Sequence, residues 1–225
     1  AVVSMQLLSL TGASVQKGSD AGGGAVLNAG TLRMDDCTIF GNRAYSGAAI
    51  MNRGKLVLQR CVVAANSAGT GAVFAYAGST DVKDCVFEEN SAYAGAGLVS
   101  FAPTWVSDST FRRNHATEGG AVFNADQLLM EGCNVVDNDA ENVGGGIMNA
   151  GLFARLILRD SAVTNNSAVH KGGGLLVTEG DLKEGENTSS AVEVVNVSIS
   201  GNHALQGAGV FNSGTLTLNA TDVIG

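Results

Sequence analysis

The sequence contains one proline among 225 residues, and it is also poor in aromatic and charged side chains. Aromatic residues make up 5% of the chain and charged residues 15%, whereas a charged share of about 25% is usual. Collagen needs abundant proline and a strict Gly-X-Y period, and neither is present. No stretch reaches the ~20 consecutive apolar residues of a membrane helix, so we expect no membrane insertion in this segment.

Basic residues are scarce as well. Thirteen Lys and Arg stand against 21 Asp and Glu, which gives a net charge of −8. Proteins that bind nucleic acid normally carry a basic stripe, so we expect no nucleic-acid partner. The hydrophobic content of 45% is too high for a disordered chain. Glycine is the abundant residue, with 31 copies, and its distribution needs explanation.

Asparagine recurs at a regular spacing, and this repeat determines the predicted fold. The first four gaps are 24 residues each, and the last two are 28 and 36. Apolar residues lie three and eight positions before each asparagine, and alanine lies two positions after it. The repeated asparagines are Asn42, Asn66, Asn90, Asn114, Asn138, Asn166 and Asn202.

Each repeat holds three short apolar runs. The first repeat shows them as Gly23–Val26, Thr31–Met34 and Cys37–Ile39. Apolar residues alternate within each run, which is the period of a strand, and Gly, Asn and Asp separate the runs as turns require. We therefore predict an all-β protein, a parallel β-solenoid with three faces and about nine coils of 24 residues, spanning residues 1–225 as one unit. Successive coils would pair at ~4.8 Å.

Residues one repeat apart stack along the axis of such a solenoid, so each repeated position forms a column. The asparagines suit a tight corner, because their side chains tolerate left-handed backbone and can bond one another up the stack. Glycine suits the same corner. Gly18 lies 24 residues before Asn42, so it is the expected corner residue of the first coil.

The cysteines also fall in one column of the predicted core. Stacked residues have parallel Cβ vectors, which are unfavourable for a disulfide. We expect free, buried thiols that behave as small apolar side chains, and a metal site is not expected because one column offers one ligand per coil. The four cysteines are Cys37, Cys61, Cys85 and Cys133.

The paired GGA[ILV] and F-x-x-N motifs resemble the repeats of chlamydial-type polymorphic outer membrane proteins. F-x-x-N is literal at Phe87–Asn90 and Phe111–Asn114, and Ile or Val replaces Phe elsewhere. The GGA[ILV] motif is literal at Gly23–Val26 and Gly119–Val122. The resemblance covers nearly the whole chain. It implies a right-handed, pectate-lyase-like β-helix, an extracellular or cell-surface location, and an adhesive or structural role.

Two insertions interrupt the repeat at the same corner of adjacent coils. They lie around residues 151–155 and 178–190, and long insertions on a regular scaffold often carry function. The longer one is either a solvated acidic loop or a cation or ligand site; calcium would need several converging oxygens, and no EF-hand spacing is present. Its acidic residues are Glu179, Asp181, Glu184 and Glu186.

An enzyme must be weighed, because polysaccharide lyases and glycoside hydrolases share this architecture. A glycosidase needs two carboxylates at a defined separation. Asp84 and Asp108 would lie one strand spacing apart with Lys83 beside them, which makes them the best catalytic candidates. The alternative is a column of turn residues, since Asp is common at corners. Trp105 replaces an outward residue and could stack on a sugar ring or on another protein.

The histidines and the glycosylation motifs add weaker signals. His115 and His203 share a column but lie three coils apart, so they cannot share a metal, and His170 falls in a loop. No cofactor is predicted apart from calcium in the acidic insertion. In a secreted eukaryotic protein, Asn-x-Ser/Thr sequons could carry glycans, and they begin at Asn165, Asn187, Asn196 and Asn219.

These observations favour a non-enzymatic extracellular or cell-surface scaffold, either adhesin-like or a structural component of a surface assembly. Its expected partners are other protein chains or cell-surface glycans. The alternative is a carbohydrate-active enzyme of the β-helix type, a polysaccharide lyase or a glycoside hydrolase. Solenoids need capped ends, and neither end of this sequence contains an evident cap. We therefore expect the chain to be a segment of a longer protein.

Overall fold

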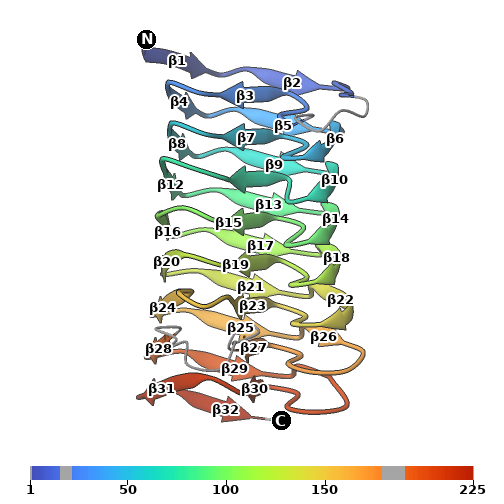
Figure 1. Ribbon diagram of the computed structural model, residues 1–225, viewed down its shortest axis with the longest axis vertical. Coiled ribbons are helices and arrows are strands. Elements are labelled where there is room, and N and C mark those ends of the chain that lie inside the picture. The colour runs from blue at the N-terminus through green and yellow to red at the C-terminus, as the bar shows by residue number, and fades with distance from the viewer. Residues whose placement is uncertain (1, 16–21, 179–190, 225) are drawn as a thin grey trace.

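The computed structural model describes residues 2–15, 22–178 and 191–224. The chain winds into a stack of coils, and every strand pairs in parallel with the corresponding strand of the next coil (Figure 1). The described residues contain no helix, and hence none that could cross a membrane. Strands β1 and β2 lie at one end of the stack and β31 and β32 at the other (Figure 1). The predicted all-β parallel β-solenoid is confirmed.

Two of the sheets contain nine strands each. Sheet A comprises β1 (Val2–Gln6), β4 (Thr31–Asp35), β8 (Lys55–Gln59), β12 (Ser79–Lys83), β16 (Thr104–Ser107), β20 (Gln127–Glu131), β24 (Arg155–Arg159), β28 (Ala191–Val195) and β31 (Thr215–Asn219). Sheet B comprises β2 (Ser9–Thr11), β5 (Thr38–Phe40), β9 (Val62–Ala64), β13 (Val86–Glu88), β17 (Thr110–Arg112), β21 (Asn134–Val136), β25 (Ala162–Thr164), β29 (Ser198–Ser200) and β32 (Asp222–Ile224).

The other two sheets are shorter. Sheet C comprises β6 (Arg43–Ser46), β10 (Ser67–Thr70), β14 (Ser91–Ala94), β18 (His115–Glu118), β22 (Asp139–Val143) and β26 (Ser167–Ala168). Sheet D comprises β3 (Val26–Asn28), β7 (Ile50–Asn52), β11 (Val73–Ala75), β15 (Leu98–Ser100), β19 (Val122–Asn124), β23 (Ile147–Ala150), β27 (Leu175–Thr178) and β30 (Val210–Asn212).

The solenoid thus has four faces, and the expectation of three is corrected. Sheet C follows directly after each ladder asparagine, where the sequence contains small and polar residues. One alanine per strand faces inward there; it is buried in four strands, for example Ala44 and Ala116, and half-buried in β10 and β14. The residues after each asparagine alternate too little to predict a strand from the sequence. They form one because they pair with the same residues of the neighbouring coils. Nine strands in sheets A and B correspond to about eight full turns.

The register of the first coil also differs from the expectation. β1 pairs with β4 through Val2↔Thr31, and β2 pairs with β5 through Leu10↔Ile39, so the first repeat is 29 residues long rather than 24. The backbone N–H of Ala13 donates to Asn42 Oδ1 at 2.9 Å. Ala13 therefore occupies the corner assigned to Gly18, and the extra residues belong to the segment 16–21, outside the described residues.

The core is one continuous column of apolar side chains inside the stack. Inner strands of sheets A and B, such as β20 and β24, alternate buried residues with more exposed ones, as a half-buried strand should. Phe87 and Phe111, from the two literal F-x-x-N motifs, are fully buried and stack with ring centroids 4.5 Å apart. Identical positions in adjacent coils therefore contact each other directly.

The repeated asparagines form a buried ladder at the corner between sheets B and C. Each Nδ2 except that of Asn202, the last in the ladder, donates to Oδ1 of the asparagine in the next coil at 2.9–3.0 Å. The same Oδ1 accepts a backbone N–H at 2.9–3.1 Å. The predicted bonding up the stack is confirmed. The left-handed residue is the one before each asparagine, such as Gly41 or Arg113, and not the asparagine itself.

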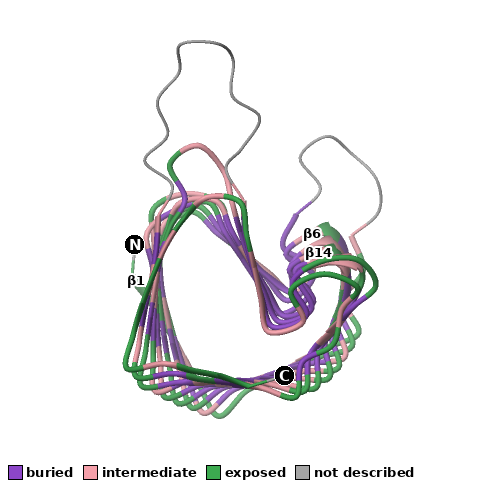
Figure 2. Ribbon diagram, turned by 90° about the horizontal axis from the view of Figure 1, so that it is seen from below, coloured by how far each residue is buried: buried purple, intermediate pink, exposed green. Residues whose placement is uncertain are grey.

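The glycine-rich run makes a tight turn between sheets C and D. Gly95 has a φ of +51°, and a Cβ there would lie 2.7 Å from Val99 Cγ2 and 2.8 Å from the Phe123 backbone nitrogen. Met51, Phe74 and Val99 form a second buried cluster, on the opposite face of sheet D from core residues such as Ile50. In the view along the axis, the outline of the coils turns inward beside sheet C (Figure 2).

The cysteine column is buried, and all four thiols are free, as expected. The thiols bond to the backbone instead, as in Cys133 Sγ to the Glu131 carbonyl oxygen at 3.3 Å. Burial raises the pKa of the Cys133 thiol to about 11. The hydrogen bond with Cys61, together with burial, raises the pKa of Cys85. These thiols act as small packing groups.

Alkaline pH should destabilise the protein through Cys133. An unfolded thiol titrates near 9.0, so between pH 9 and about 11 the unfolded state loses its proton first. We expect no effect of this group below pH 8 and a loss of up to about 2 kcal/mol in the free energy of unfolding near pH 11. Urea unfolding at pH 8 and at pH 10.5 measures this change in the free energy of unfolding.

Cys133→Ser is the matched control, because serine occupies the same column at Ser109 and Ser161. This variant should remain folded and lose its share of the alkaline destabilisation. An unchanged pH dependence in the variant would show that Cys133 does not contribute.

Candidate functional site

The corner between sheets A and B contains the predicted catalytic carboxylates. One residue of each coil adopts a left-handed conformation there, with φ between 44° and 64°. Five of the nine residues in this column are Asp or Asn and the other four are Leu, Arg, Gly and Ala, so the feature that all of them share is the left-handed backbone. The column reads Leu7, Asp36, Arg60, Asp84, Asp108, Gly132, Asp160, Asn196 and Ala220.

Asp84 and Asp108 lie in this column, one coil apart, and Lys83 is the exposed last residue of β12. Their backbone N–H groups continue the stack, with Asp84 donating to Ser107 and Asp108 to Glu131. A Cβ on Gly132 would lie 2.7 Å from Asp108 Oδ1, so the Asp108 carboxylate extends over the glycine of the following coil. Both carboxylates therefore occupy turn positions.

Oppositely charged side chains pair between adjacent coils on the outer surface. Arg60 Nε bonds Asp36 Oδ1 at 2.7 Å, and this bond holds the pKa of Asp36 below its ordinary value. Arg112 pairs with Glu88 at 2.7 Å in the same manner. These exposed pairs join adjacent coils, and each contributes little to stability.

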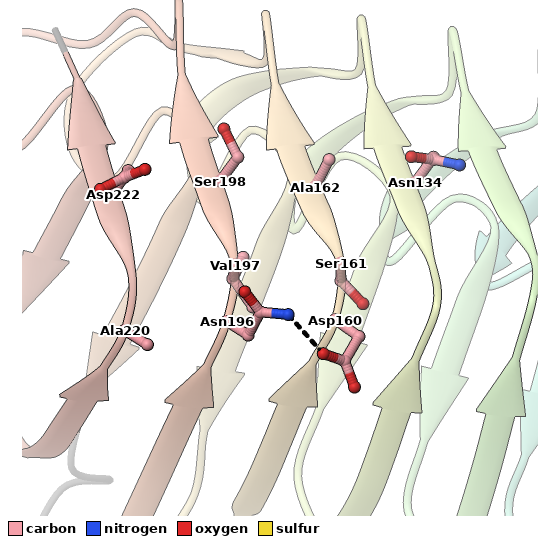
Figure 3. A pocket seen from close by; sticks show the side chains of 9 residues that line it. All are labelled: Asn134, Asp160, Ser161, Ala162, Asn196, Val197, Ser198, Ala220 and Asp222. Atoms are coloured by element: carbon pink, nitrogen blue, oxygen red, sulfur yellow. Dashed lines mark hydrogen bonds between the residues drawn. The ribbon is translucent and has the colours of Figure 1, made fainter.

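A shallow polar pocket of about 370 Å³ lies further along the same corner, near the C-terminal end (Figure 3). Asp160 and Asn196 come from the corner column, and Asn196 Nδ2 donates to Asp160 Oδ1. Ser198 and Asp222 come from the outer face of sheet B, with the small Ala162 between polar neighbours (Figure 3). Asp160 and Asp222 are two strands apart in the stack and also two positions apart along the strand direction, so their backbones are separated by more than two strand spacings of ~4.8 Å.

Trp105 lies on the outer face of sheet A and is 47% exposed. It lines a second depression, of about 270 Å³, together with Leu129 and Ile157 from the next two coils. The register places these three side chains in one outward column. The predicted outward position of Trp105 is confirmed, and the apolar surface beside it was not anticipated.

Aromatic side chains also gather on the outer face of sheet D. Phe74 is buried beneath Tyr76 and Phe101, with ring centroids at 5.5 and 5.3 Å. Tyr76 and Phe101 are 49% and 44% exposed, and Arg53 lies over the Tyr76 ring at 5.5 Å. The sequence contains a signal for this group. Aromatic residues recur in successive repeats near the positions between the Gly-Gly-Ala run and the Asn-x-Gly turn.

The insertions contribute little to the described surface. Residues 151–154 form a short loop before β24, in which Phe153 is 64% exposed and Ala154 is buried. The longer insertion follows β27, which ends at Thr178. The acidic residues predicted there, Glu179, Asp181, Glu184 and Glu186, and the sequon residue Asn187 lie outside the described residues.

The remaining sequons and the histidines lie on the surface. Asn165, Asn196 and Asn219 are exposed. His115 Nδ1 is 3.0 Å from an oxygen of Asp139 in the next coil, and His170 and His203 are exposed. In the described ranges, no three His, Cys, Asp or Glu side chains come together in a way that could hold a metal ion.

Comparison with known proteins supports the fold and leaves the activity open. The family model described as "Right handed beta helix region" matches residues 9–104. No curated protein matches the sequence significantly. The same register of parallel strands continues beyond the matched residues to β31 and β32. The chain folds as a right-handed parallel β-helix.

Proposed function

We propose that the chain is a non-enzymatic β-helix scaffold of an extracellular or cell-surface assembly, which presents a binding surface to glycans or to other proteins. The single observation that carries this proposal is the nature of the candidate catalytic column. Leucine, alanine, glycine, arginine and asparagine occupy the same corner as Asp84 and Asp108. The corner requires a left-handed turn, for which Asp and Asn are suitable residues.

The distribution of polar groups supports the same function. The buried asparagine side chains bond to one another and to the backbone, and the exposed ion pairs join adjacent coils. These contacts stabilise a rigid rod. Exposed rings on sheets A and D, such as Trp105, Tyr76 and Phe101, remain available for contact with a partner. Aromatic residues of this kind are enriched at binding surfaces.

Substitution of the candidate carboxylates tests the proposal. Asp84→Asn combined with Asp108→Asn should fold, because Asn196 occupies the same corner with a φ of +54°. We expect the double variant to retain the binding of intact cells or extracted surface glycans at the wild-type level. Incubation with acidic and neutral polysaccharides, followed by assays of reducing ends and of unsaturated products, should yield no product from either protein. Turnover by the wild type that the double variant lacks would overturn the proposal.

The second candidate function is a glycoside hydrolase, favoured by the pocket that contains Asp160 and Asp222. Inverting glycosidases hold two carboxyl groups roughly 6.5–9.5 Å apart, so the side chains of Asp160 and Asp222 would have to lean toward each other across this pocket. This alternative requires hydrolysis that Asp160→Asn or Asp222→Asn abolishes. Asp81→Asn, which is exposed on β12 and does not line this pocket, is the matched control that should leave such an activity in place.

A further inference from the structure

The depression beside Trp105 combines an apolar floor with polar groups on one side. Leu129 and Ile157 are half-buried and form the floor, and the Trp105 ring lies at one end. Gln127 and Arg155 lie in the neighbouring outward column and are paired in register. Ligand pockets commonly have this composition, a mainly apolar lining with a few placed polar groups.

Arg155 differs from the arginines paired on the same rod. Arg33, Arg60 and Arg159 each form an ion pair with a carboxylate. Within the described ranges, the Arg155 guanidinium has no ion-pair partner, although it is exposed at the start of β24. Arg159, at the other end of the same strand, pairs with Glu193 at 3.4 Å.

We propose that this depression binds a sugar ring that carries a carboxylate, as a lectin-like subsite of the scaffold; this inference rests on the proposed binding function. One face of a pyranose ring presents C–H groups and stacks on an aromatic side chain, here Trp105, while its edge presents hydroxyl groups to Gln127. A planar guanidinium binds a carboxylate through two parallel hydrogen bonds, and Arg155, which has no ion-pair partner among the described residues, is available for it.

The size of the depression limits its occupant. Its volume of about 270 Å³ is just under the ~300 Å³ lower limit of ordinary small-molecule sites, which suits one ring. A second depression of about 370 Å³ continues along sheet A toward the C-terminal end and shares Arg155. A longer glycan would therefore lie parallel to the axis of the rod, with its acidic sugar at Arg155.

The acidity of the whole chain does not oppose this site. The net charge is −8, but exposed charges are screened beyond about 8 Å at physiological ionic strength. Arg155 lines the depression itself, whereas Asp81 and Glu193, the carboxylates of the outward column that contains Trp105, each lie one strand beyond it, beside Trp105 and Ile157. The described residues that line this depression include no carboxylate.

Trp105 is the only tryptophan of the chain, so its fluorescence reports occupancy of this depression directly. Methyl β-D-glucuronide and methyl β-D-glucoside are the probes, since they differ only in the carboxylate. We expect saturable fluorescence changes with the glucuronide and an affinity about tenfold or more above that for the glucoside. Arg155→Gln should abolish this preference, and Arg159→Gln should retain it.

Other results would overturn the assignment. They are equal affinity for the two sugars, a preference that survives Arg155→Gln, or no saturable change with either sugar. An acetylated peptide ending in aspartate offers a carboxylate without a pyranose, and competition by this peptide as strong as that by the glucuronide would also overturn it. Cell binding that persists in Trp105→Ala, with no glucuronide binding in the wild type, would reject this subsite and leave the scaffold function standing.

Discussion

Asn114→Ala should lower the free energy of unfolding by about 4 kcal/mol, since several buried groups lose their partners together. Asn114 Oδ1 accepts from Asn90 N and Nδ2 at 3.1 and 3.0 Å, and its Nδ2 donates to Phe87 O and Asn138 Oδ1. Each unsatisfied buried polar group costs about 1–3 kcal/mol. Guanidinium unfolding followed by circular dichroism measures the change.

Asn134→Ala is the matched control, because Asn134 belongs to the next coil and is exposed on β21. It should change stability by less than about 0.5 kcal/mol. Hydrogen exchange adds spatial resolution, since each coil of a solenoid contacts mainly its neighbours. Loss of amide protection in Asn114→Ala should begin at Asn90 and the neighbouring corners. Equal stability of the two alanine variants would show that the ladder does not hold the coils together.

Gly95→Ala should destabilise the protein by roughly 2–5 kcal/mol, through a left-handed backbone and a steric clash acting together. The new Cβ would lie 2.6 Å from Leu98 O, 2.7 Å from Val99 Cγ2 and 2.8 Å from Phe123 N. Two of these contacts are with backbone atoms, which cannot move without disturbing the pairing of sheet D. Thermal unfolding and the yield of soluble protein measure the effect.

Gly41→Ala isolates the conformational part of this effect. Gly41 has a φ of +65°, and a Cβ there would meet nothing within 4 Å. Alanine already occupies left-handed positions at Ala65 and Ala220, so we expect a cost of only about 1 kcal/mol. A loss in Gly95→Ala no larger than in Gly41→Ala would contradict the claim that the turn between sheets C and D is sterically closed.

The repeat in the sequence predicted the solenoid because stacked coils place identical positions in contact. The asparagine ladder and the free thiols followed from the same rule, as the bonds of Asn90 and Asn114 show. Sheet C was not predicted, since residues such as Arg43–Ser46 show little alternation and become a strand only by pairing between coils. The first coil was aligned wrongly at Gly18. Its repeat is five residues longer than the others, and apolar residues still match apolar residues when it is aligned with a spacing of 24.

The surface sites were harder to predict for a physical reason. Corner residues such as Asp84 repeat because the backbone turns there, so a periodic carboxylate resembles a catalytic pair in the sequence. The depression at Trp105 depends on residues from three coils, including Arg155 after an insertion, and the sequence alone did not place them together. Only the register of sheet A shows that Trp105, Leu129 and Ile157 share one outward column.

The most direct test of a scaffold that binds rather than catalyses is one experiment that measures retention and turnover of the same glycans. Immobilised wild-type protein and the Asp84→Asn, Asp108→Asn double variant are incubated with acidic oligosaccharides, and both the bound and the released material are analysed by mass spectrometry. We expect both proteins to retain intact oligosaccharide equally and to release no shortened product. Shortened or unsaturated product from the wild type, absent with the double variant, would contradict the account.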